Sequence, residues 1–336
     1  MDFSDNYSKG CQACQKGKWL CIYLTYLCNA SCSFCPAPVK DKDIVKSAFG
    51  NNPETILHNL NKYPFEGLSF SGGECFMVYD RLLSWLTFFK KYKPELYFWA
   101  YTNGLNLNEE QLTALKIAGL NELRFNIAAW GYNHPGVLKN LAISTKIFQH
   151  VAVEIPSIPG DREKLLKLLP KLDELGVDYL NLHEYILVPS DPSIKNAPKA
   201  EFVMNYDTLM QYHPRSIANT DEIKKLSEQM GLNIKINSCS LAKKEHQMLG
   251  RRLTMGSLLK EEHEKLTDDG FLETIIVLPE KEIKLQELFD NYQAIERSRL
   301  YHPDDYTGNS KNAYRLRILP KLGLKGVHKI HQYIKL

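Results

Sequence analysis

Residues 28–36 read CNASCSFCP, which places three cysteines, Cys28, Cys32 and Cys35, within eight residues at the spacing C-x3-C-x2-C. Clustered cysteines in a chain that begins without a secretory signal bind metal more often than they form disulfides. Structural zinc sites usually take four ligands in two C-x2-C pairs, whereas three thiolates leave one coordination position open. The stretch therefore predicts a metal centre with an open position, on a loop. The alternatives are a zinc knuckle or buried thiols.

The composition is that of a large globular chain. It has 336 residues, 44% hydrophobic content and a net charge of +3, which does not favour nucleic acid as a partner. The first ten residues, MDFSDNYSKG, are polar and lack the apolar region of a secretory signal. No run of about 18 apolar residues occurs, so we expect no membrane span. We expect the protein in the reducing cytoplasm.

Strand-like and helix-like segments alternate along the first 185 residues. Six such units in a row, each of about 30 residues, predict an α/β fold with a parallel sheet, either open or curled into a barrel. A seventh strand is expected at 232–237. The six expected strands are 19–25, 67–70, 96–101, 123–128, 151–155 and 179–185, and the helices are 53–61, 80–91, 108–119, 136–148 and 161–176, the last with a kink at Pro170.

The pattern loosens after Tyr185. Residues 188–220 are rich in proline and polar residues and predict a long loop. Thr220 is expected to cap a helix that ends near Gly231, and a basic helix should run to about Leu266. Residues 270–278, GFLETIIVL, should open an α/β piece of uncertain fold. We expect three parts: a cysteine-containing segment 1–18, a main domain 19–240 and a C-terminal extension 241–336.

Four later motifs follow the cysteine group, one for each of the next four strands. They are Ser71-Gly72-Gly73-Glu74, Tyr101-Thr102-Asn103-Gly104, Asn126 within the fourth strand, and Ile158-Pro159-Gly160 after the fifth. With the C-x3-C-x2-C spacing and Phe34 before the last cysteine, this ordered set resembles the radical SAM superfamily. The resemblance covers roughly residues 19–240. It implies a partial (βα)6 parallel barrel with the site at the carboxyl ends of the strands.

The resemblance also implies the cofactors. Cys28, Cys32 and Cys35 would hold a [4Fe–4S] cluster whose open iron is chelated by the amino and carboxylate groups of S-adenosylmethionine (SAM). An external one-electron donor of flavodoxin or ferredoxin type would drive cleavage of SAM to a 5′-deoxyadenosyl radical, which abstracts hydrogen from a substrate. The protein's part is positioning and tuning. The remaining cofactor-binding residues implied are Phe34, Gly72, Gly73, Glu74, Asn103, Asn126 and Ile158.

Each of these motifs also has a simpler interpretation. Gly72-Gly73 is typical of a turn that ends a strand, and Asn103-Gly104 is a common turn pair. Asn126 could be a polar residue at a strand edge. The family often has proline after GGE, where this chain has Cys75. That change puts a thiol close to the expected active site, and Cys75 is therefore a catalytic candidate.

The remaining cysteines predict a second metal centre, either a second [4Fe–4S] cluster or zinc. Cys11 and Cys14 form a C-x2-C pair, and Cys21 and Cys239 are the other candidates. A redox pair at Cys11 and Cys14 is an alternative, and Cys21 and Cys239 could be packed thiols. If the first and seventh strands are parallel, Cys21 and Cys239 lie at opposite ends of the sheet and cannot share a site.

Two further features bear on the substrate. His183-Glu184 ends the sixth strand, where it could handle protons or orient substrate, or form a satisfied polar pair. The last 31 residues contain seven Lys or Arg and no acid, which is typical of a solvated basic face or of a surface that docks an acidic peptide, a carrier or RNA.

Three functional hypotheses follow. The first is a radical SAM enzyme that acts on a peptide, protein or small metabolite, with peptide modification or oxidation favoured. The second is an activase that installs a glycyl radical on a partner enzyme. The third is a non-catalytic iron–sulfur or zinc protein that transfers electrons, which would not cleave SAM under reduction.

Overall fold

Seven parallel strands form the main sheet of the computed structural model, which describes residues 6–35, 42–187, 203–205, 210–279, 298–320 and 329–336. The strand order β1-β2-β3-β4-β5-β6-β10 follows the chain, and every neighbouring pair is parallel. The strands are β1 (Trp19–Thr25), β2 (Gly67–Gly72), β3 (Tyr97–Thr102), β4 (Glu122–Phe125), β5 (His150–Ser157), β6 (Tyr179–Glu184) and β10 (Lys235–Cys239).

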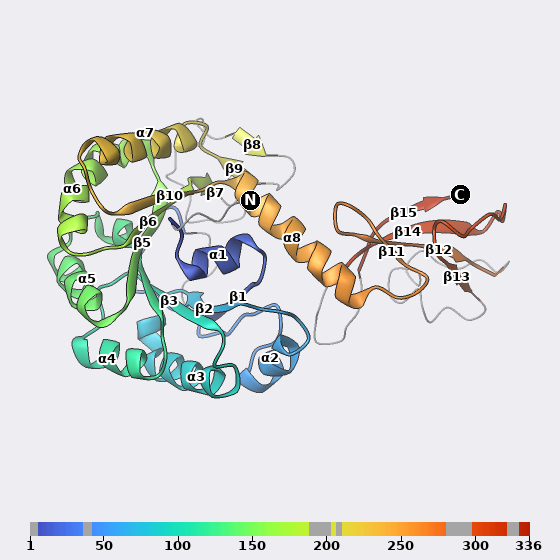
Figure 1. The fold of residues 1–336 in the computed structure, drawn as a ribbon, viewed down its shortest axis with the longest axis horizontal. Coiled ribbons are helices and arrows are strands. Elements are labelled where there is room, and N and C mark those ends of the chain that lie inside the picture. Colours follow the sequence, from blue (N-terminus) through green and yellow to red (C-terminus); the bar gives the residue numbers. More distant parts are fainter. Residues whose placement is uncertain (1–5, 36–41, 188–202, 206–209, 280–297, 321–328) are drawn as a thin grey trace.

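The sheet curls into an incomplete barrel with helices around its outside (Figure 1). This confirms the predicted parallel α/β fold and settles the choice between an open sheet and a barrel. The outer helices are α2 (Pro53–Leu60), α3 (Tyr79–Tyr92), α4 (Glu109–Ile117), α5 (Pro135–Ile147), α6 (Arg162–Glu174) and α7 (Ser216–Gln229). Helix α6 continues through Pro170.

The two faces of the barrel strands differ in polarity. In β4, Leu123 and Phe125 pack into the hydrophobic core under the outer helices, whereas the alternate residues Glu122 and Arg124 lie on the inner face. The same alternation in β5 buries Val153 outside and sets a carboxylate, Glu154, inside. Charged groups inside a barrel are costly unless they are paired. Their presence on the inner face therefore indicates that a functional site lies there.

Helix α1 (Lys9–Gln15) lies against this inner face, inside the arc of outer helices (Figure 1). Gly10 makes the contact possible, because a Cβ at this position would come within 2.6 Å of Arg124 Nη2. Helix α8 (Leu241–Leu259) follows β10, contacts α1 and runs out to the C-terminal sheet.

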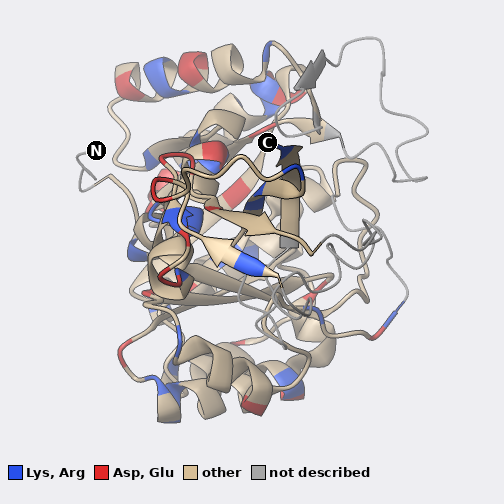
Figure 2. Cartoon of the chain, turned by 90° about the vertical axis from the view of Figure 1, so that its right-hand side faces the viewer, with Lys and Arg blue, Asp and Glu red and all other residues tan. Residues whose placement is uncertain are grey.

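The C-terminal extension contains an antiparallel sheet with a small hydrophobic cluster of its own. The described residues of the extension, helix α8 and this sheet, agree with the expected smaller α/β piece. Figure 2 views the molecule from this side and shows charges of both signs on α7. The sheet comprises β11 (Lys265–Leu266), β12 (Leu272–Val277), β13 (Arg299–Tyr301), β14 (Ala313–Leu319) and β15 (Lys329–Lys335).

Short elements account for most of the remaining differences from the sequence-based expectation. A three-stranded sheet of β7 (Ile186–Leu187), β8 (Val203–Asn205) and β9 (Met210–Tyr212) occupies part of the expected loop, while residues 188–202 and 206–209 of that loop lie outside the described residues. Three 3-10 helices follow strand ends: η1 (Cys75–Val78), η2 (Ile127–Trp130) and η3 (Pro159–Asp161). Asn126 consequently lies just after β4, not within it.

Two expected boundaries are wrong because tertiary contacts override local signals. Thr220 does not cap α7, which begins at Ser216; the Thr220 hydroxyl instead donates to Ser157 Oγ at 2.8 Å inside the fold. Strand β5 continues through Pro156 to Ser157, where its partner β6 still pairs with it.

None of the described helices is both long and apolar enough to span a lipid bilayer.

Candidate active site

A cavity of about 410 Å³ opens at the carboxyl ends of the barrel strands and reaches down the inner face. It brings together residues that are far apart in the sequence. The predicted site residues that line it are Cys21, Cys28, Cys32, Phe34, Cys35, Gly72, Gly73, Asn103, Asn126, His183 and Glu184. Glu74, Cys75, Ile158, Cys11, Cys14 and Cys239 are not among the lining residues.

The cysteine loop leaves β1 and carries three free thiols into this cavity. The Ala30 N–H donates to Cys28 Sγ at 3.4 Å, and the Cys35 N–H donates to the Cys32 carbonyl at 3.3 Å. In the described part of the chain, no three His, Cys, Asp or Glu side chains converge as ligands of one metal ion. A [4Fe–4S] cluster takes each thiolate on a different iron, so its ligands do not converge on a single point.

Gly72 and Gly73 are required by close contact with the chain that leads into the cysteine loop. A Cβ on Gly72 would lie 2.1 Å from the Thr25 carbonyl oxygen, and one on Gly73 would lie 2.0 Å from the Leu27 carbonyl oxygen. The Gly73 N–H donates to Thr25 O at 2.8 Å, and Gly72 has φ +124°, which favours glycine. The glycines therefore fix the GGE segment to the cysteine loop, as well as lining the cavity.

Glu74 lies behind the cavity wall as a buried anchor. Its Oε1 accepts from Thr102 Oγ1 at 2.9 Å and from the Phe76 N–H at 3.0 Å, and its Oε2 accepts from the Asn103 N–H at 2.6 Å. Burial raises the pKa of this carboxyl, although these hydrogen bonds oppose the shift. Glu74 thus joins the GGE and TNG segments.

The two predicted asparagines differ in how well their side chains are satisfied. Asn103 is engaged within the protein: its Nδ2 donates to Asn29 Oδ1 at 2.5 Å, and its Oδ1 accepts from Trp130 Nε1 at 3.2 Å. Asn126 Oδ1 is buried and, within the described structure, has no hydrogen-bond partner. An unsatisfied buried oxygen at a cavity wall is costly, and a ligand hydroxyl would satisfy it.

Cys75 and Ile158 stand apart from the cavity. Cys75 is fully buried at the start of η1, where its Sγ donates to the Ser71 carbonyl at 3.5 Å. Ile158 lies between β5 and η3, and only the preceding residues Ile155 and Pro156 reach the cavity. The structure thus does not bring these two candidates into contact with the space where a ligand would bind.

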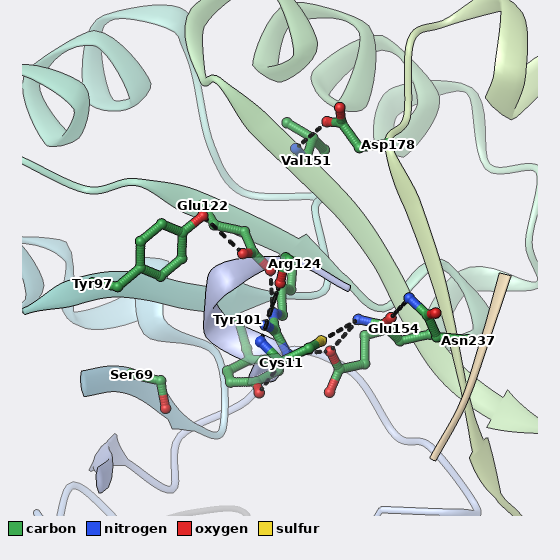
Figure 3. A network of polar contacts seen from close by, with 12 residues as sticks. Cys11, Ser69, Tyr97, Tyr101, Glu122, Arg124, Val151, Glu154, Asp178 and Asn237 are labelled. Atoms are coloured by element: carbon green, nitrogen blue, oxygen red, sulfur yellow. Dashed lines mark hydrogen bonds and ion pairs between the residues drawn. The ribbon is translucent and has the colours of Figure 1, made fainter. Parts of the chain in front are cut away.

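An ionic network lies on the inner face of the barrel, where two of its members, Arg124 and Glu154, line the cavity (Figure 3). Arg124 Nε donates to Glu122 Oε1 at 2.6 Å, and its Nη1 donates to Glu154 Oε2 at 2.7 Å. Arg124 also packs over the Trp99 and Tyr101 rings. Burial alone would raise the pKa of Glu154, but Arg124 and His183 outweigh it and hold the pKa below its usual range.

His183 connects this network to the cavity. Its Nε2 lies 2.7 Å from Glu154 Oε1, and Cys239, its partner across the β6–β10 pair, hydrogen-bonds to the same ring. Burial acts to lower the pKa of His183, but Cys239 and Glu154 prevail and raise it to about 9. His183 can therefore present a cation to the cavity at neutral pH.

Glu184 has a structural contact that the sequence did not indicate. Although it lines the cavity, its Oε2 accepts from the Leu241 N–H at 2.7 Å, at the first residue of α8. A carboxylate at a helix N-terminus stabilises the helix. Glu184 therefore anchors the helix that carries the C-terminal extension.

The four extra cysteines do not form one group. Cys21 lies on β1 and hydrogen-bonds to Ser69, and burial raises its pKa to about 11. Cys14, in contrast, lies near Cys239 and Cys11, whose charges act on it. Strand β10 is parallel to β6, which excludes the antiparallel arrangement weighed from the sequence.

Sequence analysis missed Arg124, Glu154 and Lys244, which also line the cavity. Strand alternation could have identified the first two, because Glu122, Arg124 and Glu154 alternate with apolar residues in segments treated as wholly buried. Lys244 had no comparable signal, because its place depends on how α8 packs.

The residues present fit the two cofactors that the sequence implied. Three free thiols at one end of the cavity suit a cluster with one open iron. Gly72 and Gly73 line the same space, as does Asn126, whose side-chain oxygen is unsatisfied.

Comparison with known proteins agrees with this geometry. The model of the radical SAM superfamily matches residues 22–189, half of the chain. A protein of Methanocaldococcus jannaschii with the provisional name glycyl-radical enzyme activating enzyme is 28% identical over 297 residues, which cover 84% of this chain and 77% of the relative.

Solved structures show the same fold. SuiB of Streptococcus suis bound to its precursor peptide SuiA gives a TM-score of 0.51 at 15% identity, over 66% of this chain and 48% of SuiB. SuiB bound to SAM gives a TM-score of 0.50 at 13% identity, over 76% and 59%. The chain thus spans about half the length of SuiB, and at this identity the similarity concerns the fold alone. With its family model matched over half its length, the chain belongs to the radical SAM superfamily of enzymes.

Proposed function

We propose that the protein binds a [4Fe–4S] cluster at Cys28, Cys32 and Cys35, binds SAM against Gly72 and Gly73, and removes hydrogen from a peptide, protein or small-metabolite substrate. A single observation carries this proposal: the three thiols and the glycine segment line one cavity with the unsatisfied Asn126 oxygen.

A cluster held by Cys28, Cys32 and Cys35 would supply the electron for reductive cleavage of SAM. The protein's own residues position the reactants. Gly73, hydrogen-bonded to Thr25, keeps the SAM-facing backbone at a fixed place relative to the cysteine loop. The Asn126 side-chain oxygen accepts a hydrogen bond from a hydroxyl of the ligand, and Glu74 joins the GGE and TNG segments. The substrate would occupy the part of the cavity that lies along the inner face of the barrel.

The test is an anaerobic assay of 5′-deoxyadenosine after reconstitution with iron and sulfide and addition of SAM and dithionite. Wild type should form 5′-deoxyadenosine, and Cys32→Ala should not. Ser33→Ala is the matched control, because Ser33 is an exposed neighbour in the same loop that does not line the cavity. Equal formation by wild type and Cys32→Ala would refute the proposal.

We further propose a second metal centre at Cys11 and Cys14, with Cys239 as the additional cysteine. Burial and the charges of Cys239 and Cys11 raise the pKa of the Cys14 thiol, and the proximity of these two cysteines supports the proposal. About eight irons per chain would indicate two [4Fe–4S] clusters and about four would indicate one. Cys11→Ala should reduce eight to about four without loss of SAM cleavage, and bound zinc would identify the other alternative.

The electron is proposed to come from an external donor of flavodoxin or ferredoxin type. A cytoplasmic location is proposed with it, supported by eight cysteines that are all free thiols. Reduced flavodoxin should replace dithionite in the assay above.

A second candidate function, activation of a glycyl-radical enzyme, is favoured by the M. jannaschii relative. The alignment covers 84% of this chain, so it extends beyond residue 240 into the C-terminal extension. An activase would leave a stable protein-based radical on its partner, visible by electron paramagnetic resonance. Its substrate would have to be a flexible loop that reaches into the cavity.

A further inference from the structure

Three cationic residues are among those that line the cavity: Arg124, His183 and Lys244. Arg124 pairs with Glu122 and Glu154, and His183 pairs with Glu154. Lys244 makes no hydrogen bond or ion pair through its side chain to any residue that the structure describes. Of these three cations, Lys244 is therefore the one available to an anionic ligand.

The position of Lys244 is not explained by the stability of α8. It lies in the first turn, where the positive end of the helix dipole disfavours a cation. Its neighbour Lys243 donates to Tyr7 Oη at 3.0 Å and to the Ser238 carbonyl at 2.9 Å. The helix end itself is capped by Glu184 and Ser240. Lys244 serves none of these contacts, and its side chain is half-buried at the cavity wall.

One neighbour within the protein competes as an explanation. Burial raises the pKa of the Cys239 thiol, but His183 and Lys244 act in the opposite direction and the net shift is downward. Lys244 could therefore serve this thiol rather than a ligand. The two roles differ in what happens to ligand affinity when Lys244 is replaced.

The surroundings favour recognition of an anion that carries an apolar part. Trp19, Tyr23 and Ile186 line the same cavity. A cation at the wall of a partly apolar cavity attracts an anion more strongly than one on an open surface, because less water screens it.

We propose that Lys244 binds a carboxylate group of the substrate, and hence that this enzyme acts on a carboxylate-bearing molecule. The inference rests on the proposed function, because it takes the cavity to be the place where SAM and substrate meet. The carboxylate can be a peptide's terminal group or an acidic side chain, and the two share the same chemistry.

The test measures binding of small probes to the reconstituted full-length protein by calorimetry, in the presence of SAM. N-acetylphenylalanine presents a terminal carboxylate, and N-acetylglutamate α-amide presents a side-chain carboxylate. Their neutral counterparts are N-acetylphenylalanine amide and N-acetylglutamine amide. We expect at least one acid to bind wild type tenfold or more tightly than its neutral counterpart. The acid that does so shows whether Lys244 recognises a terminal or a side-chain carboxylate.

Lys244→Met should abolish this preference, and Lys244→Arg should retain most of it. Lys243→Met is the matched control, because Lys243 does not line the cavity, and it should keep the wild-type preference. The inference is overturned if wild type shows no preference, if Lys244→Met keeps it, or if Lys244→Met loses SAM binding, which would make Lys244 a SAM ligand. Failure of wild type itself to bind SAM would instead refute the proposed function.

Discussion

At the residue scale, the contact between Gly73 and Leu27 decides how the cofactor-binding segments fit together. A Cβ at residue 73 would stand 2.0 Å from a backbone oxygen, and backbone cannot move aside as a flexible side chain can. The cysteine loop and the GGE segment are therefore held by one tight junction.

Gly73→Ala should accordingly separate the two segments. We expect the free energy of unfolding to fall by about 1–3 kcal/mol or more, as in other overpacked sites, and bound iron to be lost on gel filtration. Urea unfolding and iron analysis measure both. Gly250→Ala in helix α8 is the control, because a Cβ there would lie 3.4 Å from its nearest neighbour, the Lys16 carbonyl oxygen, and alanine favours a helix. A stable, iron-retaining Gly73→Ala protein would contradict the expectation.

Glu154 gives the fold a specific dependence on pH. Its pKa in the folded protein lies below the ordinary value of 4.5, so the ionised carboxylate stabilises the fold fully above that value. This stabilisation is lost as the pH falls through 4.5 toward the folded-state pKa. Glu154→Gln leaves Arg124 with one fewer carboxylate, and removing one partner of a buried ion pair typically costs about 3–5 kcal/mol.

Urea midpoints of wild type and Glu154→Gln between pH 7 and pH 3 measure this effect. The variant should be less stable at pH 7, and the gap should narrow as the pH falls below 4.5. A gap that stays constant, or an equal midpoint at pH 7, would show that the Arg124–Glu154 pair does not stabilise the fold.

The residues that the sequence identified and those it missed differ in a physical way. Cys28, Cys32, Cys35, Gly72 and Gly73 were predictable because chemistry dictates both their type and their spacing along the chain. Lys244 was not, because its place at the cavity wall comes from the packing of helix α8, far along the chain from those motifs.

At the element scale, the junction between β6 and α8 joins the barrel to the C-terminal extension. Glu184 accepts the Leu241 N–H, so a residue predicted to be catalytic also caps a helix. The two roles predict different consequences for the same pair of substitutions.

Glu184→Gln keeps an oxygen that can accept the Leu241 N–H, whereas Glu184→Ala removes it. If capping is the main role, Glu184→Ala should lose about 1–2 kcal/mol, and Glu184→Gln should lose less and still turn over substrate. Thermal unfolding and substrate-dependent turnover measure this. A Glu184→Gln protein with wild-type stability and no turnover would instead support the catalytic role.

Element types were predictable where periodicity is strong and local. All seven strands of the main sheet follow from apolar runs between turn signals. The start of α7 could not be predicted, because it depends on buried contacts such as that of Thr220 with Ser157. The antiparallel C-terminal sheet could not be predicted either, because it depends on pairing between distant strands.

At the scale of the whole molecule, the barrel divides its residues by face. The outer face builds the core with the helices, and the inner face carries the charges, with α1 packed against it. The parallel sheet was predictable from alternating elements, but its closure to a partial barrel was not, because curvature depends on side-chain packing across strands.

The most direct test of the central claim is electron paramagnetic resonance of the reduced, reconstituted protein with and without SAM. Wild type and Ser33→Ala should show a [4Fe–4S] signal that changes when SAM is added, because SAM would bind the iron that no cysteine would hold. Cys32→Ala should show no such change. An iron-loaded wild-type protein whose signal is indifferent to SAM, and which never cleaves SAM, would contradict the account and favour an electron-transfer protein.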